Sequence, residues 1–263
     1  MKNIMYYEGR FKDYNVLIVG AGSGIGQSCA KRFAQEGATV LICDIDEKGL
    51  KATSEEIKKI GNIYESFVFD IGIKEEVDST INMILRKYMK IDVLVNSAGI
   101  VKENPFLDVS EEEWLKQINI NLNGAFHITQ PILKNMIENR FGKIINITSK
   151  SGLIGRPRRT AYSASKFGMN GLTQALALEV AEYGINVNAV CPSRIESQLT
   201  TTLLEKRAAI ENKTYEEVRD AYAKTVPIGR LGLPEDVAAL TAFLATEEAK
   251  YITGQFISTS GGR

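Results

Sequence analysis

Short apolar runs rich in β-branched residues alternate with longer segments of helical periodicity along the chain. A strand buried on both faces reads as a continuous apolar run, and parallel strands need crossover helices, so this alternation predicts repeated βαβ units around a buried parallel sheet. The predicted strands span residues 14–20, 38–44, 64–70, 91–96, 142–148, 185–191 and 255–258. The predicted helices span residues 25–36, 47–60, 74–90, 111–138, 161–183 and 235–245.

Three local signals refine this outline. Ser110 followed by Glu113 matches the reciprocal capping pattern that opens a helix. Pro131 should kink or break the predicted helix 111–138, because proline removes a backbone donor and its ring clashes with the preceding turn. Residues 199–224, within an insertion at about 197–226, have helical character and interrupt the alternation. This insertion is either a lid over a site or an ordinary surface excursion.

The charge balance argues against several functional classes. The 32 basic and 32 acidic residues cancel, so no net field attracts nucleic acid or an anionic membrane surface. The first ten residues lack the apolar core of a signal peptide, and no run of 18 uncharged apolar residues is long enough to span a bilayer. Without long linkers or repeats, the chain is expected to be one cytoplasmic domain over residues 1–263 that binds neither nucleic acid nor membranes.

The cysteines and the single histidine argue against disulfides and metals. Cys29, Cys43 and Cys191 form no CxxC pair and are expected to be small buried hydrophobic residues in a reducing compartment. His127 lies in a helical run of apolar residues, so we expect it to be packed rather than catalytic. No metal site is predicted.

A glycine-rich turn follows the first predicted strand and opens the first predicted helix. In Gly20-Ala21-Gly22-Ser23-Gly24-Ile25-Gly26, backbone N–H groups and a helix N-terminus can face a pyrophosphate, and glycine permits its close approach. The spacing is GxxxGxG rather than GxGxxG. The segment is a nucleotide loop or a plain tight turn, and its position between a strand and a helix favours the nucleotide loop.

Asp44 closes the second predicted strand. A carboxylate there accepts hydrogen bonds from an adenosine ribose and repels a 2′-phosphate. No Arg or Lys stands beside Ser23 in the glycine turn to pair with that phosphate. Both observations favour NAD over NADP, the alternative being that Asp44 is simply a turn residue at a strand end.

Asp70 ends the third predicted strand, and Asn96-Ser97-Ala98-Gly99 ends the fourth. Both segments should lie at the carboxyl edge of the sheet, where open α/β sheets bind ligands. Small residues there leave room for an adenine ring and the nicotinamide ribose, although each residue taken alone is an ordinary turn signal.

Tyr162 is followed four residues later by Lys166, and Ser149 precedes their predicted helix. Residues i and i+4 share one face of a helix, so the ammonium should lie near the phenol and lower its pKa from about 10 toward working pH. The hydroxyl of Ser149 can hydrogen-bond a substrate carbonyl or alkoxide. A tyrosine and a lysine four residues apart are common by chance, so the pair depends for its meaning on the surrounding motifs.

The chain resembles the short-chain dehydrogenase/reductase family in a series of motifs that occur in the family's order. They are the glycine turn at 20–26, Asp44, Asn96-Ser97-Ala98-Gly99, Asn121, Ser149, Tyr162-Ser163-Ala164-Ser165-Lys166 and Pro192. The resemblance covers nearly the whole chain. It implies a Rossmann-like, doubly wound sheet of seven parallel strands, a nicotinamide cofactor and, commonly, a homotetramer.

The same resemblance implies the roles of four residues. Tyr162 would be the general acid/base, Lys166 its partner and a ligand of the nicotinamide ribose, Ser149 the residue that orients the substrate oxygen, and Asn121 a holder of a proton-relay water. Hydride would pass between a secondary alcohol and NAD as Tyr162 moves the proton. The expected cofactor contacts are Gly20, Ser23, Gly24, Ile25, Gly26, Asp44, Asp70, Ile71, Asn96, Ala98, Gly99, Tyr162, Lys166, Pro192 and Ile195.

Four positions depart from the family pattern. Val19 stands where the family has threonine, and Ser97 replaces the second asparagine of its NNAG signature, which weakens outer hydrogen bonds without touching the chemistry. Ser193 replaces a glycine and can restrict the backbone beside the nicotinamide. Ser260 replaces the aspartate of a terminal Asp-Gly-Gly.

Within the family, the segments 149–152, 181–185 and 226–230 resemble sugar-alcohol dehydrogenases such as sorbitol-6-phosphate 2-dehydrogenase, and acetoin/butanediol dehydrogenases have a similar insertion. Basic residues add an independent observation, because guanidinium groups suit phosphate or carboxylate, although solvated surface or subunit contacts explain any one of them. The expected substrate is a polyol, sugar alcohol or hydroxyketone, with or without an anionic group. Its expected contacts are Ser149, Ser151, Arg156, Arg159, Tyr162 and Arg194; Arg158 lies in the same segment.

Two other kinds of function stay open. The same apparatus can reduce a hydroxysteroid ketone or a 3-oxoacyl thioester, although Asp44 argues against the usual NADPH-dependent acyl reductases. The third hypothesis is a non-catalytic NAD-binding protein, since a fold alone does not establish function. The intact Asn121, Ser149, Tyr162 and Lys166 argue against it.

Overall fold

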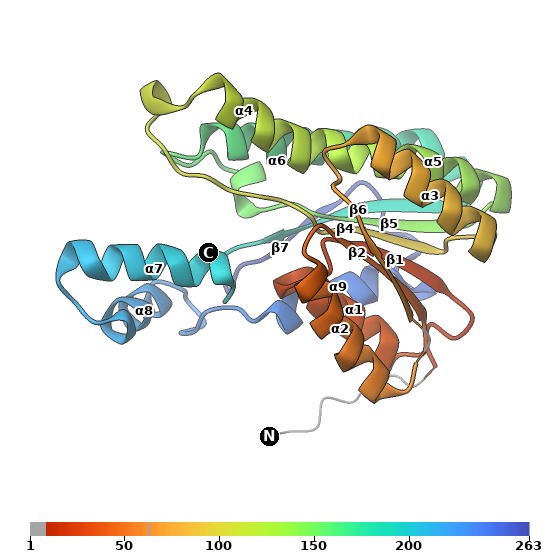
Figure 1. The fold of residues 1–263 in the computed structure, drawn as a ribbon, viewed down its shortest axis with the longest axis horizontal. Coiled ribbons are helices and arrows are strands. Elements are labelled where there is room, and N and C mark those ends of the chain that lie inside the picture. Colours follow the sequence, from red (N-terminus) through yellow and green to blue (C-terminus); the bar gives the residue numbers. More distant parts are fainter. Residues whose placement is uncertain (1–8, 63, 263) are drawn as a thin grey trace.

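Seven parallel strands form one sheet at the centre of the molecule (Figure 1). The computed structural model describes residues 9–62 and 64–262 and gives the strand order β3-β2-β1-β4-β5-β6-β7. The strands are β1 (Asn15–Val19), β2 (Thr39–Asp44), β3 (Tyr64–Val68), β4 (Val93–Asn96), β5 (Gly142–Ile147), β6 (Ile185–Pro192) and β7 (Phe256–Thr259). All seven predicted strands are confirmed, because each observed end lies within two residues of its prediction.

Side chains alternate along each strand, so the sheet has a core on either face. In β1, Val16 and Ile18 enter one core, whereas Leu17 and Val19 enter the other. The first face is covered by α1 (Gly24–Gln35), α2 (Glu47–Ile60) and α9 (Pro234–Leu244), and the second by α3 (Lys74–Tyr88), α5 (Gly124–Asn139) and α6 (Thr160–Val180) (Figure 1). Short 3-10 turns are η1 (Phe106–Asp108), η3 (Lys150–Gly152), η4 (Ala181–Tyr183) and η5 (Glu247–Ala249). The chain is thus a single-domain, doubly wound α/β fold.

The predicted helix 111–138 is interrupted, but Pro131 does not break it. α4 (Glu111–Ile118) passes into a π-helical turn, η2 (Asn119–Asn123), and α5 then continues through Pro131. A proline removes one backbone hydrogen bond, which α5 tolerates because Ile128 and Ile132 anchor it in the core. The interruption therefore arises from the π-helical turn, which holds a candidate site residue.

The capping pattern at the start of α4 forms only in part. The hydroxyl of Ser110 accepts a hydrogen bond from the backbone N of Glu113 at 3.1 Å. The carboxylate of Glu113 pairs instead with Lys102 at 2.7 Å and accepts a bond from the amide of Asn104 at 2.8 Å. Glu113 consequently ties α4 to the loop that follows β4.

The insertion forms a helical hairpin, which confirms its predicted helical character. α7 (Gln198–Glu211) and α8 (Tyr215–Lys224) project from the body of the protein (Figure 1). Their contact is a small core of Leu204, Ala208 and Val218. Because this core is separate from those of the sheet, the hairpin is held together mainly by its own side chains.

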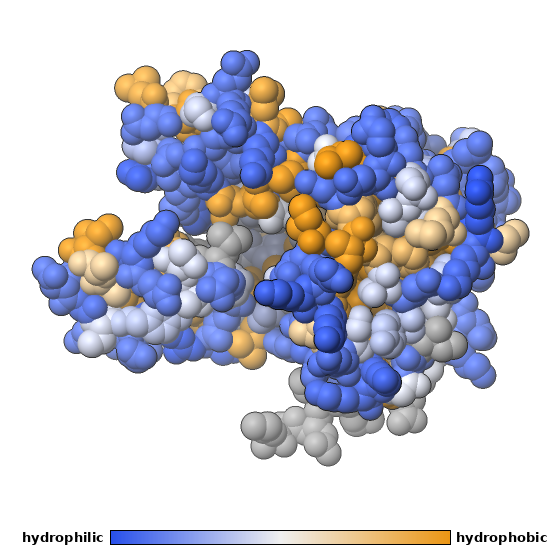
Figure 2. Space-filling view, viewed as in Figure 1, coloured by the Kyte–Doolittle hydropathy of each residue, from blue (hydrophilic) through white to orange (hydrophobic). Residues whose placement is uncertain are grey.

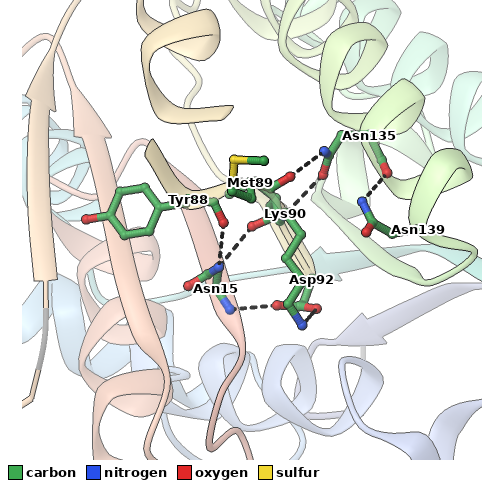
Figure 3. A network of polar contacts seen from close by, with 8 residues as sticks. Asn15, Tyr88, Met89, Lys90, Asp92, Asn135 and Asn139 are labelled. Carbon is green, nitrogen blue, oxygen red and sulfur yellow. Dashed lines mark hydrogen bonds and ion pairs between the residues drawn. The ribbon is translucent and has the colours of Figure 1, made fainter. Parts of the chain in front are cut away.

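A polar network fixes the chain between α3 and β4, at the amino edge of the sheet (Figure 3). Asn15 donates its backbone N–H to Asp92 at 2.8 Å and its side-chain amide to the carbonyl of Lys90 at 3.0 Å. Asn135 of α5 donates to the carbonyl of Met89 at 2.9 Å. These bonds hold β4 in register with β1, so the turns at the opposite, carboxyl edge also lie side by side.

Candidate active site

The turns after β1 and β4 meet at the carboxyl edge, where the strand order reverses. Gly20 has a left-handed φ of +86°, and a Cβ there would lie 2.4 Å from the backbone N of Ala98. A Cβ on Gly26 would lie 1.9 Å from the carbonyl oxygen of Gly20. Only glycine fits either position, because backbone packs directly on backbone.

The same turn has the open helix N-terminus that a pyrophosphate requires. Ser23 precedes α1 in an extended conformation, and within the described structure its side chain makes no capping hydrogen bond. A Cβ on Gly24 would meet no described atom within 4 Å. Free N–H groups and a positive dipole end therefore face open space, which fits an anionic cofactor.

Buried hydrogen bonds behind the glycine turn were not predicted from the sequence. The hydroxyl of Thr53, on α2, donates to the carbonyl of Ala21 at 2.8 Å and accepts from the side chain of Gln27 at 2.9 Å. Thr53 is fully buried. A threonine inside an amphipathic helix carries no local signal for this contact, which joins segments 32 residues apart.

Asp44 lies at the end of β2, beside the glycine turn. Its carboxylate accepts hydrogen bonds from the backbone N of Gly22 at 2.8 Å and of Asp46 at 3.0 Å. Each oxygen thus uses one acceptor position and keeps another for a ribose hydroxyl. The two interpretations of Asp44, as a turn residue and as a ribose ligand, are compatible in this geometry.

The turn after β3 presents its backbone at the same edge. Asp70 folds its carboxylate back onto the backbone N of Gly72 at 2.8 Å. Ile71 is 9% exposed, and a Cβ on Gly124 would lie 2.6 Å from its side chain, so η2 and α5 pack directly against this turn.

Asn96 turns its side chain away from the ligand edge. Its amide nitrogen donates to Thr129 at 3.1 Å and to Asn146 at 2.9 Å, and Asn146 in turn donates to Thr173 at 2.8 Å. This buried chain joins β4 and β5 to α5 and α6. The backbone of Ala98 and Gly99 therefore lies at the ligand edge, as predicted for cofactor contacts. The side chain of Asn96 instead links β4 to its neighbours inside the protein.

Asn121 lies in the π-helical turn, which carries its side chain to the loop after β4. Its amide oxygen accepts from the backbone N of Ile100 at 2.7 Å, and its nitrogen donates to the carbonyl of Ile100 at 2.8 Å and to Ser165 at 3.1 Å. A Cβ on Gly99 would lie 3.2 Å from this side chain and 3.3 Å from Lys166 Nζ. Asn121 is therefore a brace between that loop and α6.

Ser149, Tyr162 and Lys166 come together at one end of α6. Ser149 hydrogen-bonds Tyr162, and its hydroxyl also accepts from the backbone N of Ser151 at 3.0 Å. The ammonium of Lys166 lies 5.8 Å from the centre of the Tyr162 ring and donates to the carbonyl of Ile147 at 3.0 Å. The predicted trio is thus assembled, with Lys166 3% exposed.

Burial dominates the electrostatics of this trio. Desolvation raises the pKa of Tyr162 above its usual value, although the hydrogen bond with Ser149 and the charge of Arg159 act in the opposite direction. Desolvation also lowers the pKa of Lys166 to about 8. The sequence-based expectation of a lowered phenol pKa is therefore wrong for this structure, because burial outweighs the hydrogen bond with Ser149 and the charge of Arg159.

A cleft of about 990 Å³ opens above Ser149 and Tyr162, between the hairpin of α7 and α8 and the loops after β4 and β5 (Figure 2). The predicted residues Ile25, Pro192 and Ile195 line it, as do the predicted substrate contacts, which are Ser149, Ser151, Arg156, Arg159, Tyr162 and Arg194. The fold therefore gathers into one cleft residues that are up to 197 positions apart (Ile25 to Tyr222).

An ion pair between the loop after β4 and the segment before α6 was also not predicted from the sequence. Arg159 bonds the carboxylate of Glu103 at 2.5 Å, and the backbone N of Asn104 donates to the carbonyl of Arg158 at 2.9 Å. The loop after β4 is thus fastened to the segment before Tyr162. Isolated Glu and Arg residues 56 positions apart give no sequence signal for such a pair.

Two features are absent from the described part of the chain. Residues 9–62 and 64–262 contain no group of three His, Cys, Asp or Glu side chains arranged as metal ligands. Over the same residues, no helix has both the length and the apolar character needed to cross a membrane. Cys29, Cys43 and Cys191 are buried and free of disulfides, as expected.

Similar proteins are described as dehydrogenases and reductases. A family model described as short chain dehydrogenase matches residues 14–208. The 3-oxoacyl-[acyl-carrier-protein] reductase FabG of Thermotoga maritima is 39% identical over 94% of this chain and 96% of its own length. Actinorhodin polyketide ketoreductase, solved with NADPH, has a TM-score of 0.91 and 36% identity, covering 95% of this chain and 96% of its own.

A polyol dehydrogenase is also among the similar structures. NAD⁺-bound xylitol dehydrogenase has a TM-score of 0.90 and 29% identity, covering 96% of this chain and 99% of its own. The similar sequences are mainly 3-oxoacyl reductases, so the expected specific likeness to sugar-alcohol dehydrogenases is not favoured over other branches. The chain belongs to the short-chain dehydrogenase family and is an oxidoreductase that acts on CH–OH and keto groups.

Proposed function

We propose that this enzyme interconverts a secondary alcohol and a ketone with NAD, using Tyr162 as the proton-transfer group. The observation that carries the proposal is the assembly of Ser149, Tyr162 and Lys166, of which Ser149 and Tyr162 line the cleft. A bound nicotinamide supplies the hydride acceptor or donor. During oxidation the phenolate of Tyr162 accepts the alcohol proton, Ser149 holds the alcohol oxygen, and the Lys166 ammonium stabilises the negative charge.

The substrate class favoured here is a polyol or hydroxyketone. Hydroxyl and charged side chains line much of the cleft, which suits a substrate with several polar groups. A 3-oxoacyl thioester is the second candidate, because FabG of Thermotoga maritima is 39% identical. The hairpin of α7 and α8 forms one wall of the cleft, which supports its role as a lid.

The test is NAD- and NADP-linked turnover of a panel of polyols, polyol phosphates, butanediols, hydroxysteroids and 3-oxoacyl thioesters, followed by absorbance of the reduced nicotinamide. Turnover of a polyol or hydroxyketone with NAD is the expected result. Selective turnover of thioesters would replace the first candidate with the second. Binding of NAD without turnover of any compound would support a non-catalytic protein.

Asp44→Asn tests the proposed NAD preference. The amide retains an acceptor for the backbone N of Gly22 but removes the charge that repels a 2′-phosphate. We expect the ratio of kcat/KM for NADP to that for NAD to rise by about 10- to 100-fold, since a like-charge contact costs several kcal/mol. Asp46→Asn, two residues away at the N-cap of α2, is the matched control and should leave the ratio unchanged. An unaltered ratio in Asp44→Asn would exclude this carboxylate as the selector.

We also propose that the enzyme is a homo-oligomer. Exposed apolar side chains lie on three of the helices on the α5 and α6 side of the sheet: Leu115 on α4, Phe126 on α5, and Phe167 and Leu178 on α6. Large exposed apolar groups mark contact surfaces between subunits. Phe126→Glu combined with Phe167→Glu should lower the mass found by light scattering to that of a smaller species. Met83→Glu, an equally exposed position on α3, should not, and an unchanged mass in the double variant would contradict this surface.

A further inference from the structure

The cleft above Tyr162 carries a strong excess of positive charge. Eight of its lining residues are Arg or Lys and one, Glu103, is acidic, although the chain has 32 residues of each sign. The basic residues come from both walls, with Arg156 and Arg158 before α6 and Lys206 on α7. Low-dielectric walls focus the field of the charges that line them, so this cleft attracts anions.

Only part of this charge is compensated within the protein. Three of the basic side chains form ion pairs with glutamates, and they are Lys102, Arg159 and Arg207. Arg194 stacks on Tyr222, 4.2 Å from the ring centre, and donates to its carbonyl at 3.0 Å. Among the described residues, Arg156, Arg158 and Lys206 form no ion pair, and Arg156 is half-buried. A half-buried guanidinium without a counter-charge favours an anionic ligand.

Two arginines of the cleft also have backbone conformations that disfavour every residue but glycine. The φ of Arg158 is +64° and that of Arg194 is +54°. Among the described residues, positive φ also occurs at helix C-termini and in a turn, at Asp13, Met89, Arg140 and Asn212, and Arg158 itself lies in a turn after Pro157. Residues with strained backbone conformations cluster at ligand-binding sites. Both strained arginines face the same cleft.

Resting on the proposed function, we propose that the cleft holds its substrate by a phosphate group, bound between Arg156 and Arg158 on one wall and Lys206 on the other. Guanidinium groups bind phosphate in a bidentate manner, and three uncompensated cations suit a dianion better than a single carboxylate. The pyrophosphate of the cofactor is not the expected ligand of these cations, because it is expected to bind at the glycine turn. Of that turn, only Ile25 lines the cleft.

The first experiment compares sorbitol with sorbitol 6-phosphate in the wild type and in Arg156→Met and Lys206→Met, which keep side-chain length and remove the charge. In the wild type the phosphorylated compound should have the higher kcat/KM. Each variant should lose about 10- to 100-fold on it, as expected for a charge-assisted hydrogen bond, and little on sorbitol. Lys12→Met, an exposed position before β1 at the opposite edge of the sheet, is the matched control. Wild-type KM for the phosphate should rise with ionic strength.

Arg158→Gly separates charge from backbone conformation, since glycine adopts the observed φ readily. The melting temperature should stay within about 2 °C of the wild type, because little packing is lost and glycine relieves the left-handed strain. Discrimination in favour of the phosphate should fall. A variant that retains full discrimination would remove Arg158 from the proposed subsite.

Binding is measured as well as turnover, so that the two proposals fail in different ways. The NAD-loaded protein is titrated calorimetrically with sorbitol and with sorbitol 6-phosphate. Tighter binding of the phosphate, abolished by Arg156→Met, supports the subsite even if neither compound is oxidised. Equal binding and turnover of both compounds in wild type and variants would overturn the phosphate subsite and leave the alcohol–ketone reaction untouched.

A last pair of substrates identifies where the phosphate comes from. 3-Oxobutanoyl-CoA carries phosphates on its carrier arm, whereas the N-acetylcysteamine thioester of the same acid carries none. The expected result is no difference between wild type and Arg156→Met on either thioester. A loss confined to the CoA thioester would support the subsite and assign it to a carrier-arm phosphate instead of a polyol phosphate. Gluconate is the carboxylate comparison, and equal preference for it would overturn the choice of phosphate.

Discussion

Tyr162→Phe is expected to reduce kcat by about 10²- to 10⁴-fold, the range that general acid–base groups contribute. The substitution removes only the hydroxyl, which is the atom that hydrogen-bonds Ser149. The ring keeps its place on α6, one turn from Lys166. Affinity for NAD should therefore change little, because the glycine turn and Asp44 are untouched.

The measurement is steady-state turnover of the best substrate, together with quenching of protein fluorescence by NADH to follow binding. Tyr183→Phe, on the 3-10 turn after α6 and away from the cleft, is the matched control and should have wild-type kcat. Turnover retained by Tyr162→Phe would refute the proposed proton transfer. Loss of NADH binding together with turnover would point to a structural role for the hydroxyl instead.

The pH dependence of turnover should reflect the raised pKa of Tyr162. Because burial raises the pKa of Tyr162, the phenolate that accepts a proton during oxidation forms only as the pH rises. Oxidation should accordingly be favoured at alkaline pH and reduction, which needs the protonated phenol, at lower pH. A bound oxidised nicotinamide would supply positive charge and would favour the phenolate of Tyr162.

Local patterns predicted the frame of this site because each pattern has a local physical cause. The apolar run of β1 forms a strand that is buried on both faces, and Gly20 and Gly26 are glycines because backbone packs against them. The i and i+4 spacing of Tyr162 and Lys166 brings them together through helix geometry alone. Parallel strands then carry their turns to a common edge.

What sequence patterns could not predict depends on contacts between distant segments. The π-helical turn that carries Asn121 is stabilised by bonds to Ile100, and the side chain of Asn96 is drawn inward by Thr129 and Asn146. The phenol pKa depends on burial, which no spacing encodes. Pro131 does not end α5, because core packing of this helix outweighs the one lost hydrogen bond.

Burial of the site also lowers the stability of the folded protein. Lys166 is 3% exposed, and desolvation lowers its pKa from 10.5 to about 8. Below pH 8 the folded protein must hold this buried ammonium in charged form, which opposes folding. Between pH 8 and 10.5 the unfolded chain binds more protons at this position than the folded one, so stability from this group rises with pH and the penalty disappears above 10.5.

Lys166→Met should therefore stabilise the protein while it inactivates the enzyme. The lowered pKa of Lys166 corresponds to a destabilisation of about 3 kcal/mol at pH 7, which the substitution removes. The variant also loses the hydrogen bond to the Ile147 carbonyl, which costs about 1 kcal/mol. The net gain of about 2 kcal/mol should raise the melting temperature by roughly 4–8 °C for a chain of this length. Turnover and NAD affinity should both fall, since the proposed contact with the nicotinamide ribose is lost.

Urea unfolding of wild type and Lys166→Met at pH 7 and pH 10.5 measures this difference. The variant's advantage should be largest at pH 7 and be lost by pH 10.5, because the lysine is then neutral in the folded state and half deprotonated in the unfolded state, so that the missing bond to Ile147 outweighs the remaining penalty. Lys143→Met gives a matched contrast, since Lys143 is also buried but bonds Asn186 at 2.7 Å and pairs with Glu247 at 3.2 Å, so its loss should destabilise the fold. An Lys166→Met protein that is less stable than wild type at pH 7 would show that the ammonium contributes more through its contacts than it loses by burial.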